Sequence, residues 1–117
     1  DPTTLEDKVL CGYQGWFNAE GDGMNVGWRH WFQAHTTDPS VDLWPDTTGF
    51  SSDELYPCPL RMKNGAQALL YSSCNATTVD RHFQWMKEYG LDGVFLQRFV
   101  SELYSEAMLK VRTQVTA

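Results

Sequence analysis

Two short apolar runs along the chain predict buried strands. The first covers about 8–12 and the second about 93–99. Nearly continuous apolar runs of this length are typical of parallel strands that helices cover on both faces. A shorter strand is expected over 66–72.

Two other stretches place apolar residues at helical spacing. In the first, about 78–89, these residues are Val79, Phe83, Trp85 and Met86. Thr77 or Thr78 precedes it as a candidate N-cap, and Gly90 follows it as a stop. In the second stretch, about 102–115, the apolar residues are Leu103, Ala107, Val111 and Val115. Both stretches predict amphipathic helices.

Between the first strand and the first helix lies an irregular stretch, about 18–65, that is rich in glycine and proline. A long loop inside a compact domain usually carries function. The resulting order is strand, long loop, helix, strand and helix, so we expect an α/β fold with parallel strands.

Polar groups follow both predicted strands. Tyr13 and Gln14 follow the first strand, and Gln97 and Arg98 close the second. In β/α barrels the functional groups lie at the carboxyl ends of the strands. Two strands are too few for such a barrel, which needs eight, so we expect either a part of a larger assembly or a different fold.

Composition excludes several classes of partner. The 117 residues are typical of one domain, and a net charge of -6 argues against nucleic acid and anionic membranes. No apolar run reaches the roughly 18 residues of a membrane span. The chain does not open on a signal peptide, and its first residues are consistent with a processed, mature end. No cofactor is indicated.

Cysteines and a glycosylation sequon favour a secreted protein. Cys58 and Cys74 flank a segment that could fold as a hairpin, so we expect a disulfide between them. Cys11, in the first predicted strand, is interpreted as a buried thiol. Asn75 begins an Asn-Ala-Thr sequon beside Cys74, and a sequon next to a disulfide cysteine is consistent with secretion.

Four sequence strings carry a family resemblance. They are GYQGWF (12–17), GWRHWF (27–32), DLWPD (42–46) and YGLDGVFLQRF (89–99). In order and spacing they resemble proteins related to glycoside hydrolase families 71 and 99, described as endo-α-mannosidase-like or xylosidase/arabinosidase-like. The resemblance spans essentially the whole chain.

The resemblance implies the N-terminal part of a (β/α)8 barrel that acts on glycans or polysaccharides. It places the catalytic carboxylates on later strands, so no catalytic residue is expected in this chain. It implies sugar contacts at Tyr13 and at the pair His30 and Trp31. The remaining strands would then come from a second polypeptide, which makes the expected assembly a heterodimer.

The residues themselves support sugar contact. Sugars present apolar C–H faces, which aromatic rings accept, and hydroxyls, which amides and imidazoles bind. On this basis Gln14, Trp16, Gln97 and Arg98 join the candidate substrate-binding set. The alternatives are that the aromatic residues and His30 pack in the core, and that Arg98 forms a salt bridge to the long loop.

The remaining acids and the histidines are weaker candidates for catalytic or metal-binding residues. Asp42 and Asp46 are interpreted as turn caps, or as acceptors of a bond from a Trp or Arg side chain, rather than as catalytic carboxylates. The three histidines, His30, His35 and His82, lack the spacing of a metal site, so no metal is expected. We therefore expect part of a secreted glycoside hydrolase that supplies sugar contacts. The alternatives are a sugar-binding lectin on a glycosidase-like barrel, and a free-standing small domain.

Overall fold

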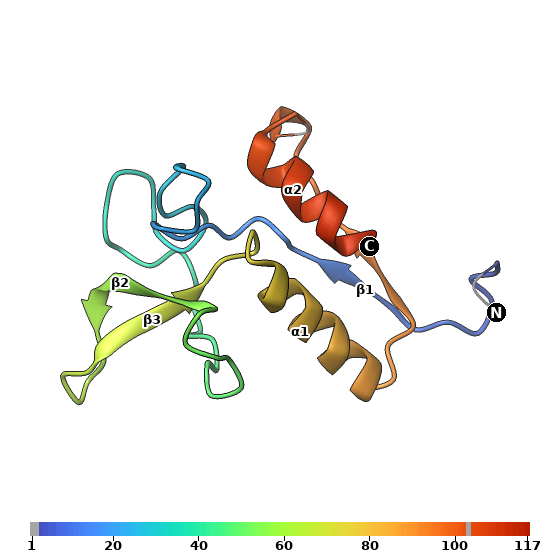
Figure 1. Ribbon diagram of the computed structural model, residues 1–117, viewed down its shortest axis with the longest axis horizontal. Coiled ribbons are helices and arrows are strands. Elements are labelled where there is room, and N and C mark those ends of the chain that lie inside the picture. Colours follow the sequence, from blue (N-terminus) through green and yellow to red (C-terminus); the bar gives the residue numbers. More distant parts are fainter. Residues whose placement is uncertain (1–2, 103) are drawn as a thin grey trace.

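The computed structural model of the protein describes residues 3–102 and 104–117. Its elements, in chain order, are β1 (Leu10–Tyr13), β2 (Leu55–Arg61), β3 (Gln67–Tyr71), α1 (Ala76–Glu88), β4 (Gly93–Leu96), the 3-10 helix η1 (Val100–Glu102) and α2 (Glu106–Val115). Figure 1 shows the β2–β3 hairpin on one side and β1, α1 and α2 together on the other.

Strands β1 and β4 form a parallel pair, in register from Leu10 opposite Gly93 to Tyr13 opposite Leu96. The backbone N–H of Gln97 donates to the backbone carbonyl of Tyr13 at 2.9 Å, which continues the pairing past the end of β4. Because parallel strands need a crossover, the chain between them includes the hairpin and α1. Apart from the hairpin, which lies where a long loop was expected, this is the order of strand, helix, strand and helix expected from the sequence.

The two helices cover the same face of this parallel pair. Cys11 contacts Met86 of α1, sulfur to sulfur at 3.8 Å. Leu96 packs against Val111 of α2. Side chains alternate between the faces of a strand, so Phe95 points to the opposite face, where it is 60% exposed. The sequence instead led us to expect helices on both faces.

The β2–β3 hairpin was only half predicted. The expected strand over 66–72 corresponds to β3, but β2 lies within the stretch expected to be a loop, because Pro57 and Pro59 argued against a strand. In this two-stranded antiparallel sheet both prolines are exposed, whereas Cys58 between them is buried. Proline is tolerated at such edge positions.

The hairpin covers the larger of the two buried clusters formed by the described residues. Its buried members are Trp31, Phe32, Cys58, Ala68 and Leu70. A smaller cluster of Cys74, Ala107 and Val111 lies under α2.

The helices begin at different residues from those expected. Asn75, rather than Thr77 or Thr78, caps α1: its side chain accepts a hydrogen bond from the Thr78 amide. Ser105 caps α2 in the same way through Met108, so α2 starts later than the predicted residue 102. Leu103, which the pattern places in this helix, lies outside the described residues.

The expected disulfide between Cys58 and Cys74 is not formed. Both side chains are buried free thiols, and the half-buried Cys11 is also free. Cys58 belongs to the cluster under the hairpin, whereas Cys74 packs with α2 and accepts a bond from the Asn18 side-chain amide at 3.2 Å. The two thiols therefore lie in separate packing environments, although their segments are neighbours in sequence.

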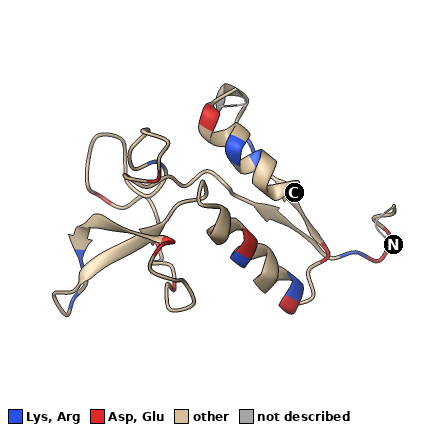
Figure 2. Cartoon of the chain, in the orientation of Figure 1, with Lys and Arg blue, Asp and Glu red and all other residues tan. Residues whose placement is uncertain are grey.

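Charged residues are dispersed over separate elements, with both signs along α1 (Figure 2). Among residues 3–102 and 104–117, no helix has the length and apolar character needed to cross a bilayer.

Candidate functional site

The carboxyl ends of β1 and β4 bring two aromatic rings into contact. Trp16 lies three residues beyond β1, and Phe99 lies three residues beyond β4. Their rings are stacked, with centroids 4.8 Å apart and planes 23° apart. Parallel strands end at the same edge of a sheet, where α/β proteins place their binding sites.

His30 joins this pair from the long loop. Its imidazole lies 5.5 Å from Trp16 and 6.1 Å from Phe99, nearly parallel to the Phe99 ring at 10°. We call Trp16, His30 and Phe99 the aromatic platform. Trp16 and His30 are half-buried, and Phe99 is 47% exposed, so the platform keeps an accessible surface.

A buried layer supports the platform from behind. The Phe17 ring meets His30 edge-on at 6.2 Å and lies 4.3 Å from the Trp31 ring. Trp31 is only 3% exposed, and its indole N–H donates to the Tyr71 carbonyl at 2.9 Å. The structure therefore places Trp31 in the core under the hairpin, next to the predicted sugar contact His30.

The Gln97 side chain lies on the open face of the parallel pair. Gln97 extends over Gly12: a Cβ added to this glycine would lie 3.4 Å from the Gln97 amide carbon. Gln14 is exposed, and Arg98 is half-buried. The structure thus places Gln97 on the side of the sheet that the helices leave uncovered.

Tyr13, by contrast, points under α1 and away from the platform. Its hydroxyl is hydrogen-bonded to Nδ1 of His82 at 2.9 Å. Burial, with a smaller contribution from nearby Tyr71, raises the pKa of Tyr13 well above its usual range. Burial also lowers the pKa of His82 to about 4, so His82 is neutral at pH 7. Tyr13 therefore fastens β1 to α1 in this structure.

Asp22, in the long loop that also carries His30, accepts several local hydrogen bonds. Asp22 accepts from the Asn18 side chain at 3.1 Å and from the Ser72 hydroxyl at 2.8 Å. The Ala19 and Met24 amides also donate to it. Burial raises the pKa of Asp22, but these hydrogen bonds together hold it below its usual value. Asp22 is therefore ionised, and its carboxylate fixes the start of the long loop.

The acids farther along the loop also have structural partners. Asp46 accepts from the Thr48 amide at 2.9 Å and the Thr48 hydroxyl at 2.8 Å, which is the turn-capping role expected for it. Glu54 is fully buried and bound by Arg81. Asp42 is exposed. Within the described residues, no group of three or more His, Cys, Asp or Glu has the arrangement of a metal site.

Sequence reasoning missed the contributions of Phe99 and Phe17. Phe99 was assigned to the second strand itself, and the only signal for its role is that it follows β4 at the same distance as Trp16 follows β1. Phe17 belongs to GYQGWF but was not singled out. The Phe99 contact is not visible without the pairing of β1 with β4, and the Phe17 contacts are not visible without the fold of the long loop.

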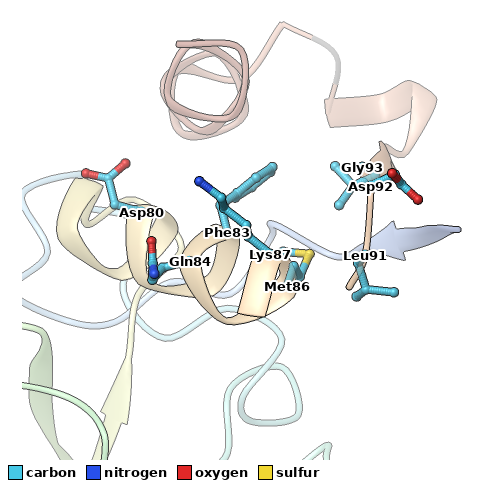
Figure 3. Close-up of a pocket in the computed structure, with 9 residues that line it drawn as sticks. Asp80, Phe83, Gln84, Met86, Lys87, Leu91, Asp92 and Gly93 are labelled. Atoms are coloured by element: carbon cyan, nitrogen blue, oxygen red, sulfur yellow. The ribbon is translucent and has the colours of Figure 1, made fainter. Parts of the chain in front are cut away.

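A hollow of about 420 Å³ lies at the other end of the parallel pair. Figure 3 shows Phe83 and Lys87 on α1, with Leu91 and Asp92 on the turn that leads into β4. Asp92 forms an ion pair with Lys8 at 3.3 Å. This hollow adjoins the amino end of β4. Open α/β sheets bind ligands at the carboxyl ends of their strands, so the aromatic platform is the better candidate site.

No protein-family model, curated protein or solved structure matches this chain significantly. The function proposed below therefore depends on the residues and the geometry described above.

Proposed function

We propose that this chain binds carbohydrate through the aromatic platform, as part of a secreted glycoside hydrolase with a (β/α)8-type barrel. The observation that carries the proposal is the stack of Trp16, Phe99 and His30 at the shared carboxyl edge of two parallel strands. The family resemblance of the sequence strings supports the same assignment.

The chemistry of the platform suits a sugar ring. The partly exposed faces of Trp16 and Phe99 offer apolar surface for the C–H face of a pyranose. His30, Gln14 and Gln97 offer donors and acceptors for its hydroxyls. A binding site that combines apolar walls with a few polar groups is the usual arrangement for a small polar ligand.

The role of this chain in the proposed enzyme is to hold the substrate rather than to cleave it. Glycosidic cleavage needs two carboxyl groups roughly 5–9.5 Å apart across the sugar. Asp22, Asp46 and Glu54 are each held in local hydrogen bonds. We therefore propose that both catalytic acids come from outside this chain, and that orientation of the sugar is its contribution to the rate.

Completion of the barrel requires further parallel strands, and we propose that a second polypeptide supplies them. The exposed Phe95 side chain on the uncovered face of β1 and β4 supports this proposal, because the next strands of a barrel would enclose it. Native and denatured masses of the purified protein test it. A native mass equal to a single chain, together with one cooperative melt, would contradict the two-polypeptide assembly.

Sugar titration of the purified protein tests the platform. We would follow tryptophan fluorescence while adding mannobiose or xylobiose, and repeat this with Trp16→Ala and Phe99→Ala. Loss of one stacking face should weaken binding roughly tenfold or more. Trp85→Phe is the matched control, because Trp85 lies on α1 and packs against Phe50, away from the platform. Equal affinities in all four proteins would contradict the assignment.

A lectin is the second candidate, and the engagement of the loop acids in structural bonds favours it for this chain alone. The two functions differ in product. Incubation of the assembled protein with a glycan that it binds should release shorter sugars if it is a hydrolase, whereas a lectin leaves the glycan intact.

A further inference from the structure

His30 has a backbone conformation that side chains rarely adopt. Its φ is +64°, in the left-handed region that disfavours residues with a Cβ. In the same loop Gly21, Gly23 and Gly27 take positive φ values, and glycine does so without strain. At position 30 the chain instead places a large ring, and that ring is the polar member of the aromatic platform.

The strained residue is held from both sides. Before it, Arg29 and Asn18 exchange two backbone hydrogen bonds, each 3.2 Å long. After it, the Trp31 carbonyl accepts from the Ser40 amide at 2.9 Å. Strained conformations persist where the surroundings fix them in this way, and they concentrate at functional sites.

Ser40 makes the bond that reaches His30 itself. Its hydroxyl donates to the His30 carbonyl. The intervening segment folds back on itself, with the Gln33 amide donating to the Asp38 carbonyl at 2.9 Å, and this closure brings Ser40 beside His30. One serine thus binds two successive carbonyls, so it sets the orientation of the peptide that follows the imidazole.

We propose that Ser40 is a positioning residue, which holds His30 in its left-handed conformation so that the imidazole stays stacked on Phe99 and Trp16 and faces the sugar. The role of His30 toward sugar depends on the proposed function. The role of Ser40 in placing the ring depends on the geometry of this loop alone.

The first test compares Ser40→Ala with Ser40→Thr. The stacked rings should displace the imidazole proton resonances of His30 from their free positions, and NMR detects this. Ser40→Ala should move these resonances toward the free values and weaken sugar binding about fivefold, the effect of one hydrogen bond. Ser40→Thr keeps the hydroxyl and should retain both properties. Unchanged resonances in Ser40→Ala would overturn the proposal.

The second test measures the strain directly. His30→Gly and His30→Ala both remove the ring, but only glycine accepts a positive φ freely. His30→Gly should therefore melt roughly 4 °C above His30→Ala. If the alanine variant is as stable as the glycine variant, position 30 is unstrained and the proposal fails.

His35 provides the matched control for sugar binding. It has nearly the same φ, +63°, but its side chain is exposed. His35→Ala should leave the sugar affinity unchanged, whereas His30→Ala should reduce it. If the wild-type protein binds neither mannobiose nor xylobiose while Ser40→Ala still displaces the His30 resonances, the proposed function fails and the positioning role of Ser40 stands.

Discussion

Replacement of Glu54 by glutamine should strongly destabilise the fold. Glu54 has no exposed surface. Arg81 on α1 donates to it through Nε at 2.8 Å and through a terminal guanidinium nitrogen at 2.6 Å. Ser51 donates through its amide at 2.9 Å and its hydroxyl at 2.5 Å. These bonds fasten the end of the long loop to the first helix.

The size of the effect follows from the pKa of this carboxyl. The hydrogen bonds from Arg81, followed by those from Ser51, outweigh burial and lower the pKa of Glu54 from 4.5 to about 2. A shift of this size corresponds to about 3 kcal/mol of stability at neutral pH. Loss of one member of a buried ion pair costs about 3–5 kcal/mol, so Glu54→Gln should lose about 3 kcal/mol.

Urea unfolding at several pH values is the appropriate assay. Because folding lowers the pKa of Glu54, its contribution is fully present above about pH 4.5 and is lost as the pH falls toward 2. The difference in unfolding free energy between wild type and Glu54→Gln should therefore be largest at pH 7 and shrink below pH 4.5. Other titrating groups are shared by both proteins and cancel in this difference.

Glu88→Gln is the matched control. Glu88 is an exposed glutamate on the same helix as Arg81, bonded to Gln84 at 2.8 Å, and its replacement should change stability by less than about 0.5 kcal/mol. Two outcomes would refute the reasoning: a Glu54→Gln loss as small as that of Glu88→Gln, or a difference that stays constant from pH 7 to pH 3.

Three further predictions concern other groups. The unfolding free energy of the wild type should fall by up to about 3 kcal/mol as the pH falls from 6.5 to about 4, because burial lowers the pKa of His82. His82→Gln should not show this loss, and an equal loss in both proteins would contradict the reasoning. Asn75→Ala should lower the free energy of unfolding by about 1 kcal/mol, because it removes the cap of α1 together with bonds to Asp53 and Tyr56. Thermal unfolding measures this, and an unchanged stability would contradict the capping role. Thiol titration in guanidinium without reductant should count three free thiols per chain, whereas a disulfide would leave one.

The hydrogen bonds of Asn75 also affect whether this residue can carry a glycan. Both donated bonds use Nδ2, the atom to which a glycan would attach. A glycan on Asn75 would have to give up at least one of them. Intact mass of the purified protein would show whether this occurs.

Local pattern was enough to locate the helices and the parallel strands. The spacing of Val79, Phe83 and Met86 predicts α1 because a helix buries one side chain per turn. The apolar runs predict β1 and β4 because a parallel strand lies under helices. Trp16 and His30 were also identified as candidates from the sequence, through their residue types and the family resemblance.

Only the tertiary structure decided which of these residues share a site. A run that is apolar throughout does not say which face of a strand the helices cover, so the sequence left open whether Tyr13 joins a site at the strand end or packs against α1. The platform exists because β1 and β4 pair in parallel, which brings Trp16 and Phe99 together across more than 80 residues of chain. The free thiols of Cys58 and Cys74 have the same origin, since cysteine spacing does not encode the packing cluster that each side chain enters.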